Sequence, residues 1–149
     1  MNLEAIILEE IKQSVAGRIS FERWMDLALY HPDYGYYTSG KVEIGSKGDF
    51  FTSSSLGADF GELLAEQFVE MAEFLGNSRG FTLVEVGAGS GILAKDILDY
   101  LSDSYADFYQ NLSYIIVEQS QKLRERQRAT LAGYSPVSWR SWPDLADNS

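Results

Sequence analysis

The pattern of apolar and polar positions divides the chain into a helical first part and an alternating second part. In the first part, apolar side chains recur every three or four positions, which is the spacing of amphipathic helices. This pattern predicts helices over residues 3–15, 21–30 and 56–75. Ser20 is expected to cap the second helix with its hydroxyl oxygen. The first part of the chain is therefore predicted to be helical, with one long loop region.

In the second part, short β-branched runs alternate with amphipathic stretches. Strands are predicted at 81–86, 112–118 and 136–140, and helices at 92–101 and 119–133. Strands that alternate with helices at this spacing are typical of a parallel sheet with right-handed crossovers. The fold class is therefore predicted to be α/β.

Two regions follow from this division. Residues 1–79 are predicted to form a helical and loop segment, in which 31–55 is rich in Gly, Ser, Asp and aromatic residues and should form turns and a hairpin. Residues 80–149 are predicted to form the first βαβαβ part of a larger domain. A doubly wound sheet usually has about five to seven strands. The three strands predicted here lead us to expect an N-terminal fragment of a longer protein.

The charge balance excludes some functions. The chain has 12 basic and 22 acidic residues and a formal net charge of −10. This disfavours non-specific nucleic-acid binding, which needs a basic surface to replace counterions. It is compatible with a cationic ligand or a basic protein partner, and also with simple solubility. With no cysteine and one histidine, the chain has neither the thiolates nor the multiple imidazoles of common metal centres, and no metal is expected.

No apolar run approaches the roughly 20 residues of a membrane-spanning helix. The acidic, helical start "MNLEAIILEEIKQ" differs from a secretory signal and from an Arg-rich transit peptide. A cytoplasmic location is therefore expected.

The stretch "LVEVGAGSG" (83–91) is the main candidate for a ligand site. Gly87, Gly89 and Gly91 alternate directly after a predicted strand, with Ala88 between the first two. Glycines let a ligand approach the backbone closely, and ligands of parallel sheets bind at the carboxyl ends of the strands. The alternative is a tight strand-to-helix turn without a ligand.

The spacing of this turn separates the possible ligands. The dinucleotide fingerprint needs a small residue at position 92, where this chain has Ile92, and the phosphate-loop lysine is missing. The remaining pattern, E-x-G-x-G-x-G, resembles motif I of the class I S-adenosylmethionine-dependent methyltransferases. A net positive cofactor also suits the acid before the turn, because a pyrophosphate would be repelled there. Glu85 is expected to face the methionyl ammonium, directly or through water; a salt bridge or a water-exposed strand end is the alternative.

A second acid ends the second predicted strand. Glu118 lies where this topology places the carboxylate that binds the ribose hydroxyls, although it follows Gly91 by 27 residues. A generic polar strand end is the alternative. Gln119 is expected near the adenine, and Ser120 is expected to cap the next helix.

Four blocks of the chain carry a more specific resemblance: "LALYHPDYGYYTSG", "GDFFTSSSLGADFGELLAEQ", "LVEVGAGSG" and "VEQSQKLRERQ". In this order they resemble the MidA-like family, whose mitochondrial members are protein arginine methyltransferases that assist assembly of respiratory complex I. The resemblance covers residues 18 to 145 approximately. It implies a partial Rossmann-like class I methyltransferase sheet preceded by a helical and loop segment that covers the cofactor. It also implies S-adenosyl-L-methionine as the cofactor and a protein substrate.

The family's G-D-F-x-T-S element matches residues 48–53. The resemblance therefore implies cofactor contacts from Asp49 and Thr52. Phe51 is a further candidate contact, because Phe50 and Phe51 can anchor the loop or cover a flat ligand. The family commonly continues with Pro-Glu, where this chain has two serines, so no role is carried over from that Glu. Read from the residues alone, "GDFFTS" can also be a structural hairpin or a capping loop.

No catalytic base is assigned, because acceptor-binding groups in such sheets come from loops after later strands. The chain is expected to hold part of a cofactor site and to be weak or inactive alone. Two other interpretations stay open: a partner-binding or assembly module with a vestigial turn, and a nicotinamide-dependent oxidoreductase, which Ile92 disfavours.

The remaining candidates are expected to be structural. The segment "KLRERQR" (122–128) is interpreted as a solvated helix face, and His31 as a turn or surface residue. Trp139 and Trp142 are expected in the core. Packing between the N-terminal part and the core is predicted for four tyrosines: Tyr30, Tyr34, Tyr36 and Tyr37.

Overall fold

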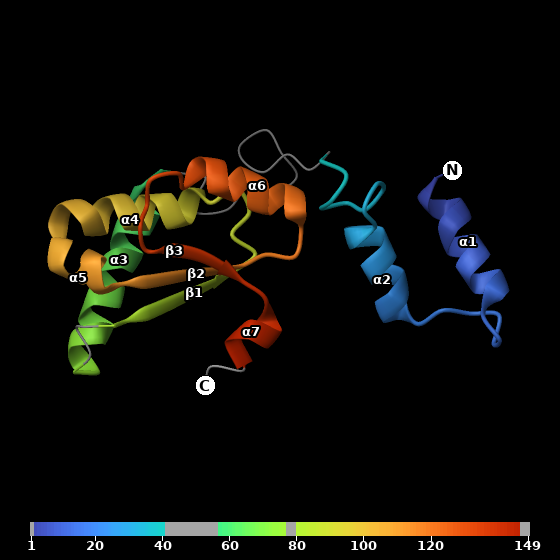
Figure 1. The fold of residues 1–149 in the computed structure, drawn as a ribbon, viewed down its shortest axis with the longest axis horizontal. Helices are drawn as coiled ribbons and strands as arrows, with labels where there is room; N and C mark the ends of the chain where they lie inside the picture. Colours follow the sequence, from blue (N-terminus) through green and yellow to red (C-terminus); the bar gives the residue numbers. More distant parts are fainter. Residues whose placement is uncertain (1, 41–56, 77–79, 147–149) are drawn as a thin grey trace.

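The computed structural model describes residues 2–40, 57–76 and 80–146 (Figure 1). The elements follow in this order: α1 (Leu3–Gln13), α2 (Phe21–Tyr30), α3 (Asp59–Phe74), β1 (Thr82–Val86), α4 (Ile92–Ser104), α5 (Ala106–Asn111), β2 (Ser113–Val117), α6 (Gln121–Thr130), β3 (Val137–Arg140) and α7 (Trp142–Ala146). No helix in the described ranges is long and apolar enough to cross a membrane.

The three strands form one parallel sheet in the order β1-β2-β3. In register, Val86 of β1 lies beside Val117 of β2, and Val117 lies beside Arg140 of β3. The carboxyl ends of all three strands therefore meet at one edge of the sheet. This arrangement confirms the α/β class predicted from the alternation of strands and helices.

The core lies between the sheet and the helices above it. Helices α4 and α6 cover the same face of the sheet (Figure 1). The most completely buried side chains there are Ile97, Leu98 and Leu101 of α4 and Ile116 of β2. Burial of these leucine and isoleucine side chains stabilises the packing of α4 on the sheet, because it removes most of their apolar surface from water. On the other face, the β1 side chains Val84 and Val86 are 45% and 57% exposed.

Helix α3 packs against α4 and belongs to the same core. Its small apolar residues Ala65, Val69 and Ala72 are buried. On the same helix, Glu66 accepts hydrogen bonds from the phenol groups of Tyr100 and Tyr105. The division at residue 79 stays a prediction, although α3, which precedes it, shares its core with the sheet.

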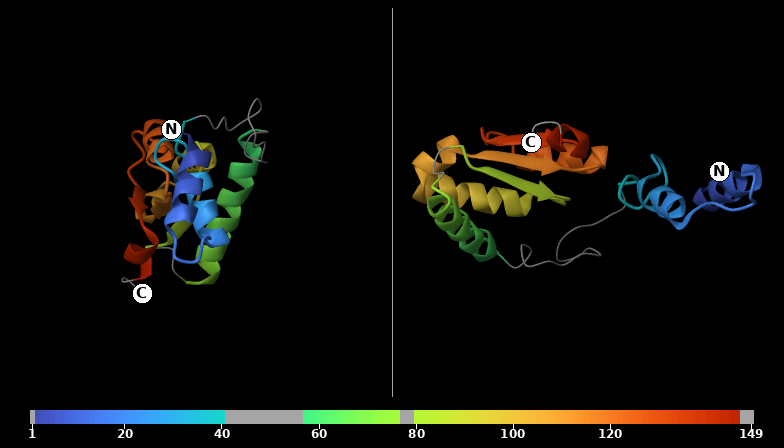
Figure 2. Two further views of the ribbon diagram at one scale, coloured as in Figure 1. Left: turned by 90° about the vertical axis from the view of Figure 1, so that its right-hand side faces the viewer. Right: turned by 90° about the horizontal axis from the view of Figure 1, so that it is seen from below.

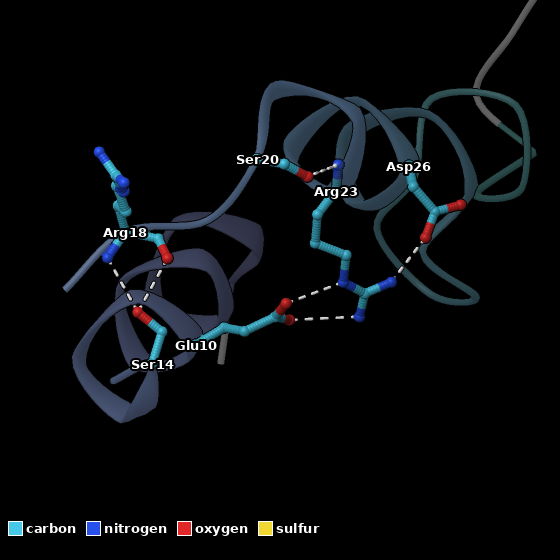
Figure 3. A network of polar contacts seen from close by, with 6 residues as sticks. All are labelled: Glu10, Ser14, Arg18, Ser20, Arg23 and Asp26. Atoms are coloured by element: carbon cyan, nitrogen blue, oxygen red, sulfur yellow. Dashed lines mark hydrogen bonds and ion pairs between the residues drawn. The ribbon is translucent and has the colours of Figure 1, made fainter. Parts of the chain in front are cut away.

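Helices α1 and α2 lie beyond the carboxyl ends of the strands (Figures 1 and 2). They are joined by a polar network (Figure 3) in which the guanidinium of Arg23 donates to both carboxylate oxygens of Glu10, at 2.8 and 3.2 Å, and to Asp26 at 2.6 Å. The Ser20 hydroxyl accepts from the Arg23 amide at 3.1 Å, which confirms the predicted cap. These ion pairs are exposed to solvent, so they contribute little to stability.

The structure corrects the sequence-based prediction at the C-terminal end. The predicted core position of Trp142 is wrong, because its side chain is 60% exposed at the start of α7, a helix that was not predicted. Asp144 accepts from the backbone amide of Ser141 at 3.0 Å, and the Asp144 amide donates to the Ser141 hydroxyl at 3.4 Å. This reciprocal cap is a helix-start signal that the sequence S-W-P-D carries. Residues 106–111, where no helix was predicted, form the additional helix α5.

The close approach of α3 and α4 gives a stability prediction. A Cβ added to Gly61 would lie 2.6 Å from the Cβ of Asp96 and 3.2 Å from its carbonyl carbon. Overpacking of this kind costs about 1–3 kcal/mol, and the helix-propensity gain of alanine over glycine is about 1 kcal/mol at most. We therefore expect Gly61→Ala to destabilise the protein by about 1–2 kcal/mol, which lowers Tm by roughly 2–8 °C.

Thermal melts of the variant and the wild type measure this effect. The matched control is Glu62→Ala, the next residue, whose side chain is exposed and whose loss should change stability by less than about 0.5 kcal/mol. A Gly61→Ala protein that melts at or above the wild-type temperature would contradict the close packing of the two helices.

Candidate cofactor site

The glycine turn continues directly from the sheet. The Gly87 amide donates to the Val117 carbonyl at 2.9 Å, and the Gly91 amide donates to the Ala88 carbonyl at 2.8 Å. Gly87, Gly89 and Gly91 have φ angles of +70°, +56° and +82°. Side chains other than glycine are strained in this left-handed region. The three predicted glycines are therefore required by the backbone path of the turn, whether or not a ligand binds.

Two of these glycines differ in what surrounds them. A Cβ on Gly87 would meet no atom within 4 Å, so this side of the turn is open. A Cβ on Gly91 would lie 3.4 Å from the Leu131 Cδ1 and 3.5 Å from the Gln127 Cα. These are ordinary van der Waals distances, so the positive φ of Gly91, and not a lack of space, makes glycine necessary there, whereas Gly87 leaves space that a ligand can enter. Ala88, between Gly87 and Gly89, is buried.

The first turn of α4 follows the glycines. Its N-cap residue Gly91 makes no side-chain capping bond, and the turn contains no acidic residue. The first amide groups of such a helix have no partner within the helix. Their positive potential favours a carboxylate ligand.

Glu85 lies on the face of β1 that carries the core. Its carboxylate accepts a hydrogen bond of 2.9 Å from the phenol of Tyr114. Burial raises the pKa of Glu85 above its ordinary value, against the smaller opposing effect of that hydrogen bond. Burial also raises the pKa of the Tyr114 phenol, and the adjacent carboxylate adds to this shift. No ion pair of Glu85 occurs among the described residues, so the predicted alternative of a salt bridge finds no support there.

Glu118 directly follows β2. One of its oxygens accepts from the Ser120 amide at 2.8 Å, and the other accepts from the Gln127 side-chain amide at 3.1 Å. A carboxylate has about four acceptor positions, so each oxygen keeps capacity for a further donor. The side chain is half-buried. This arrangement orients the carboxylate and leaves it able to accept from two hydroxyl groups.

The structure corrects the interpretation of residues 122–128 as a solvated helix face, because Gln127 is completely buried. Its amide nitrogen donates to the Gly89 carbonyl and to Glu118, each at 3.1 Å, and its amide oxygen accepts from the indole of Trp139 at 3.0 Å. The sequence carried a signal for this position. Leu123, Gln127 and Leu131 are four residues apart and therefore share one side of the helix.

The N-terminal segment contacts the turn that follows β2, next to Glu118. Ser120 caps α6 by accepting from the Leu123 amide at 3.4 Å, as predicted, and its hydroxyl also donates to the Tyr37 carbonyl at 2.9 Å. The ring of Tyr37 stacks on Tyr30 at 5.6 Å. Burial raises the pKa of Tyr30, with smaller contributions from Tyr37 and from Glu118. The rings of Tyr30 and Tyr37 thus pack on each other, and the backbone of Tyr37 contacts the turn after β2.

A cleft of about 480 Å³ lies between α2 and the exposed Gln119. Its walls include Tyr30 and the acidic residues Glu22 and Asp26. The cleft therefore places open space beside the residue that follows Glu118. The position of Gln119 near an adenine stays a prediction. The cleft is the open space beside Gln119 in which an adenine would lie.

Three predicted site residues, Asp49, Phe51 and Thr52, lie outside the described residues. Across residues 2–40, 57–76 and 80–146, no group of three or more His, Asp or Glu side chains could hold a metal ion.

The comparisons with known proteins decide the family. The sequence model of the family described as "Putative S-adenosyl-L-methionine-dependent methyltransferase" matches residues 63–149. The chain belongs to this family. S-adenosyl-L-methionine is the cofactor of the family, and the prediction of this cofactor is confirmed.

The curated relatives agree with this assignment. The chain is 40% identical over 116 residues to protein arginine methyltransferase NDUFAF7, mitochondrial, of Rattus norvegicus, which covers 77% of this chain and 26% of the relative. It is 41% identical over 117 residues to the protein of the same name of Mus musculus, covering 78% of this chain and 27% of the relative. The chain thus spans about a quarter of the length of these relatives.

Solved structures support the fold. A COG1565 superfamily protein of Burkholderia thailandensis has a TM-score of 0.66 and 31% identity, covering 93% of this chain and 34% of that chain. A second structure of a COG1565 superfamily member from the same organism, bound to S-adenosyl-homocysteine, has a TM-score of 0.66 and 30% identity, covering 93% and 36%. The resemblance to the MidA-like family and the partial class I methyltransferase fold are both confirmed.

The chemistry of the described residues fits the cofactor. Glu118 keeps acceptor capacity for two hydroxyls, and the Gly87 side of the turn is open. Glu85 is a half-buried carboxylate whose described partner is a neutral phenol, so a cationic ligand would compensate its charge.

The pKa shift of Glu85 gives a prediction with a defined sign. Because its folded-state pKa is raised, the folded protein binds this proton more tightly than the unfolded chain does. Stability is therefore lost as pH rises through the folded pKa. Glutamine in place of Glu85 does not ionise, so the variant Glu85→Gln does not lose stability in this way. We therefore expect its Tm to exceed that of the wild type at pH 8, and the difference in Tm to become smaller toward pH 4.

Thermal melts without cofactor at pH 4, 6 and 8 measure the difference. The control Glu66→Gln should behave in the opposite way, because hydrogen bonds from Tyr100 and Tyr105 lower the pKa of Glu66. Its contribution to stability is present above the ordinary pKa and disappears as pH falls, so this variant should melt below the wild type at pH 8. If Glu85→Gln melted below the wild type at pH 8, the carboxylate would be a structural stabiliser.

Proposed function

We propose that this chain binds S-adenosyl-L-methionine at the carboxyl ends of β1 and β2 as part of a protein arginine methyltransferase. The observation that carries the proposal is the pair of acids at these adjacent strand ends. Glu85 is half-buried beside a neutral phenol, and Glu118 is held in place while its oxygens can accept further hydrogen bonds. A ligand with a cationic end and two vicinal hydroxyls satisfies both acids at once.

In this proposal, each end of the cofactor has a partner in the chain. Glu118 accepts hydrogen bonds from the ribose hydroxyls, and the adenine enters the cleft beside Gln119. Glu85 attracts the methionyl ammonium, which compensates the energetic cost of its half-buried charge. The methionyl carboxylate binds at the first turn of α4, which contains no acidic residue.

When bound, S-adenosyl-L-methionine supplies a methyl group activated by its sulfonium. The described residues bind and orient the cofactor for in-line attack by a nitrogen of the acceptor, which is a positioning contribution. The attacking nitrogen forms the new bond to carbon, the carbon–sulfur bond breaks, and the nitrogen releases a proton. No described residue is assigned as the base for that proton.

The acceptor is proposed to be arginine in a protein. The support comes from the relatives, which are named protein arginine methyltransferases. A formal net charge of −10 also favours encounter with a basic polypeptide. The walls of the cleft contain Glu22 and Asp26 together with Arg23, which pairs with Asp26, so Glu22 is the acid of the cleft wall that a basic segment would meet.

Cofactor binding tests the first half of the proposal. We expect the chain to bind S-adenosyl-homocysteine with a Kd above about 1 µM. Glu118→Gln is expected to raise that Kd by roughly 10- to 100-fold, because hydrogen bonds to a charged group contribute about 1.5–3 kcal/mol. Isothermal titration calorimetry measures both values. The matched control is Glu125→Gln on the exposed side of α6, which should leave the Kd unchanged.

Two results would count against the cofactor site. Equal affinity of the wild type and Glu118→Gln would remove Glu118 from the site. Absence of S-adenosyl-homocysteine binding would favour a partner-binding module with a vestigial turn, and binding of NADH in its place would favour an oxidoreductase.

Methyl transfer tests the second half. With labelled S-adenosyl-L-methionine, we expect slow labelling of a basic peptide that contains arginine, and none of the same peptide with lysine in place of each arginine. Mass spectrometry of the two peptides measures the difference. Labelling of the lysine peptide alone would contradict an arginine acceptor.

A further inference from the structure

We propose that Gln127 is a positioning residue for the cofactor. Its side-chain amide joins the turn at Gly89 to the carboxylate of Glu118, and so sets the distance between the part of the site for the methionyl group and the part for the ribose. The inference rests on the proposed cofactor site. It adds a residue from the middle of α6 that does not belong to the glycine motif or to either strand end.

The hydrogen bonds of Gln127 leave its amide well satisfied. The nitrogen donates to two oxygens, one on each side of the site, each at 3.1 Å. The oxygen accepts from the indole of Trp139 at 3.0 Å. One side chain thus contacts the turn after β1, the end of β2 and the strand β3. Because the amide has a planar, fixed geometry, its partners cannot shift independently of one another.

Packing alone does not explain an amide at this position. Gln127 is completely buried, and it lies in the same row of α6 as Leu123 and Leu131. A leucine of similar size would continue that apolar row without the cost of burying a polar group. The polar partners of the amide therefore account for the residue, and the two partners of its nitrogen lie in the proposed cofactor site.

Gln127 helps to orient the carboxylate of Glu118. The Ser120 amide holds one carboxylate oxygen and Gln127 holds the other, so rotation of the carboxylate would break one of these bonds. A carboxylate that is oriented in advance loses less entropy when two hydroxyls bind to it. On the other side, the bond to the Gly89 carbonyl restrains a turn that has three residues in the left-handed region.

A double-mutant cycle tests this coupling. We expect Gln127→Leu to raise the Kd for S-adenosyl-homocysteine about tenfold, and to raise it less than twofold when Glu118 is already replaced in Glu118→Gln. Residues that act through one another show such non-additivity, whereas a general loss of structure would add in both backgrounds. Isothermal titration calorimetry provides the four values, and thermal melts confirm that each variant is folded.

A second variant tests the same bond by pH and does not depend on the folding of Gln127→Leu. Gln127→Glu keeps the size of the side chain and replaces the donor with a second carboxylate beside Glu118. Two adjacent carboxylates bind a shared proton more readily, and the protonated one can donate a single hydrogen bond to the other, in place of the bond from the amide to Glu118. We expect the affinity of this variant for S-adenosyl-homocysteine, relative to the wild type, to be about tenfold lower at pH 8 and to recover toward pH 5.

The outcomes separate this inference from the proposed function. If the wild type binds S-adenosyl-homocysteine and Gln127→Leu binds it equally well, or loses the same factor in both backgrounds, the positioning role is wrong and the proposed function stands. The positioning role would also be wrong if the affinity of Gln127→Glu for S-adenosyl-homocysteine, divided by that of the wild type, did not change with pH. If the wild type itself fails to bind, the proposed function fails and the inference falls with it.

Discussion

The hydrogen bond from the Gly87 amide to the Val117 carbonyl continues the parallel ladder of β1 and β2 beyond the end of β1. It determines where the chain leaves the sheet, and so where the glycine turn lies relative to Glu118 on the neighbouring strand. Parallel strands bring both carboxyl ends to one edge, and the register of Val86 beside Val117 brings the two acids to neighbouring strand ends. A shift of one residue in this pairing would turn Glu85 away from the core face.

At this edge, one buried side chain links the elements of the site. The amide of Gln127 donates to the Gly89 carbonyl of the turn and to Glu118. Gln127 and Leu131 also lie at ordinary van der Waals distance from a Cβ built on Gly91, the residue before α4. A buried amide is tolerated only where its partners are within reach, so these bonds restrain α6 relative to the turn.

The N-terminal helices are attached more lightly. Helix α1 has no buried residue in the described part of the chain, and the Glu10–Arg23–Asp26 network that joins it to α2 is partly exposed. Among the described residues, one contact of this region with the site is the hydrogen bond that the Ser120 hydroxyl donates to the Tyr37 carbonyl.

The sequence by itself determined the main helices, the three parallel strands, the glycine turn and the two acids at the strand ends, but not the short helices α5 and α7. The predicted features follow from apolar periodicity and from the backbone freedom of glycine, which are local properties of the chain. Tertiary structure decided the rest. It paired Glu85 with Tyr114 and made Gln127 a buried link between Gly89 and Glu118. Helical spacing places Gln127 in one row with two leucines, but the partners of its amide lie on other elements, so only long-range packing decides what it binds.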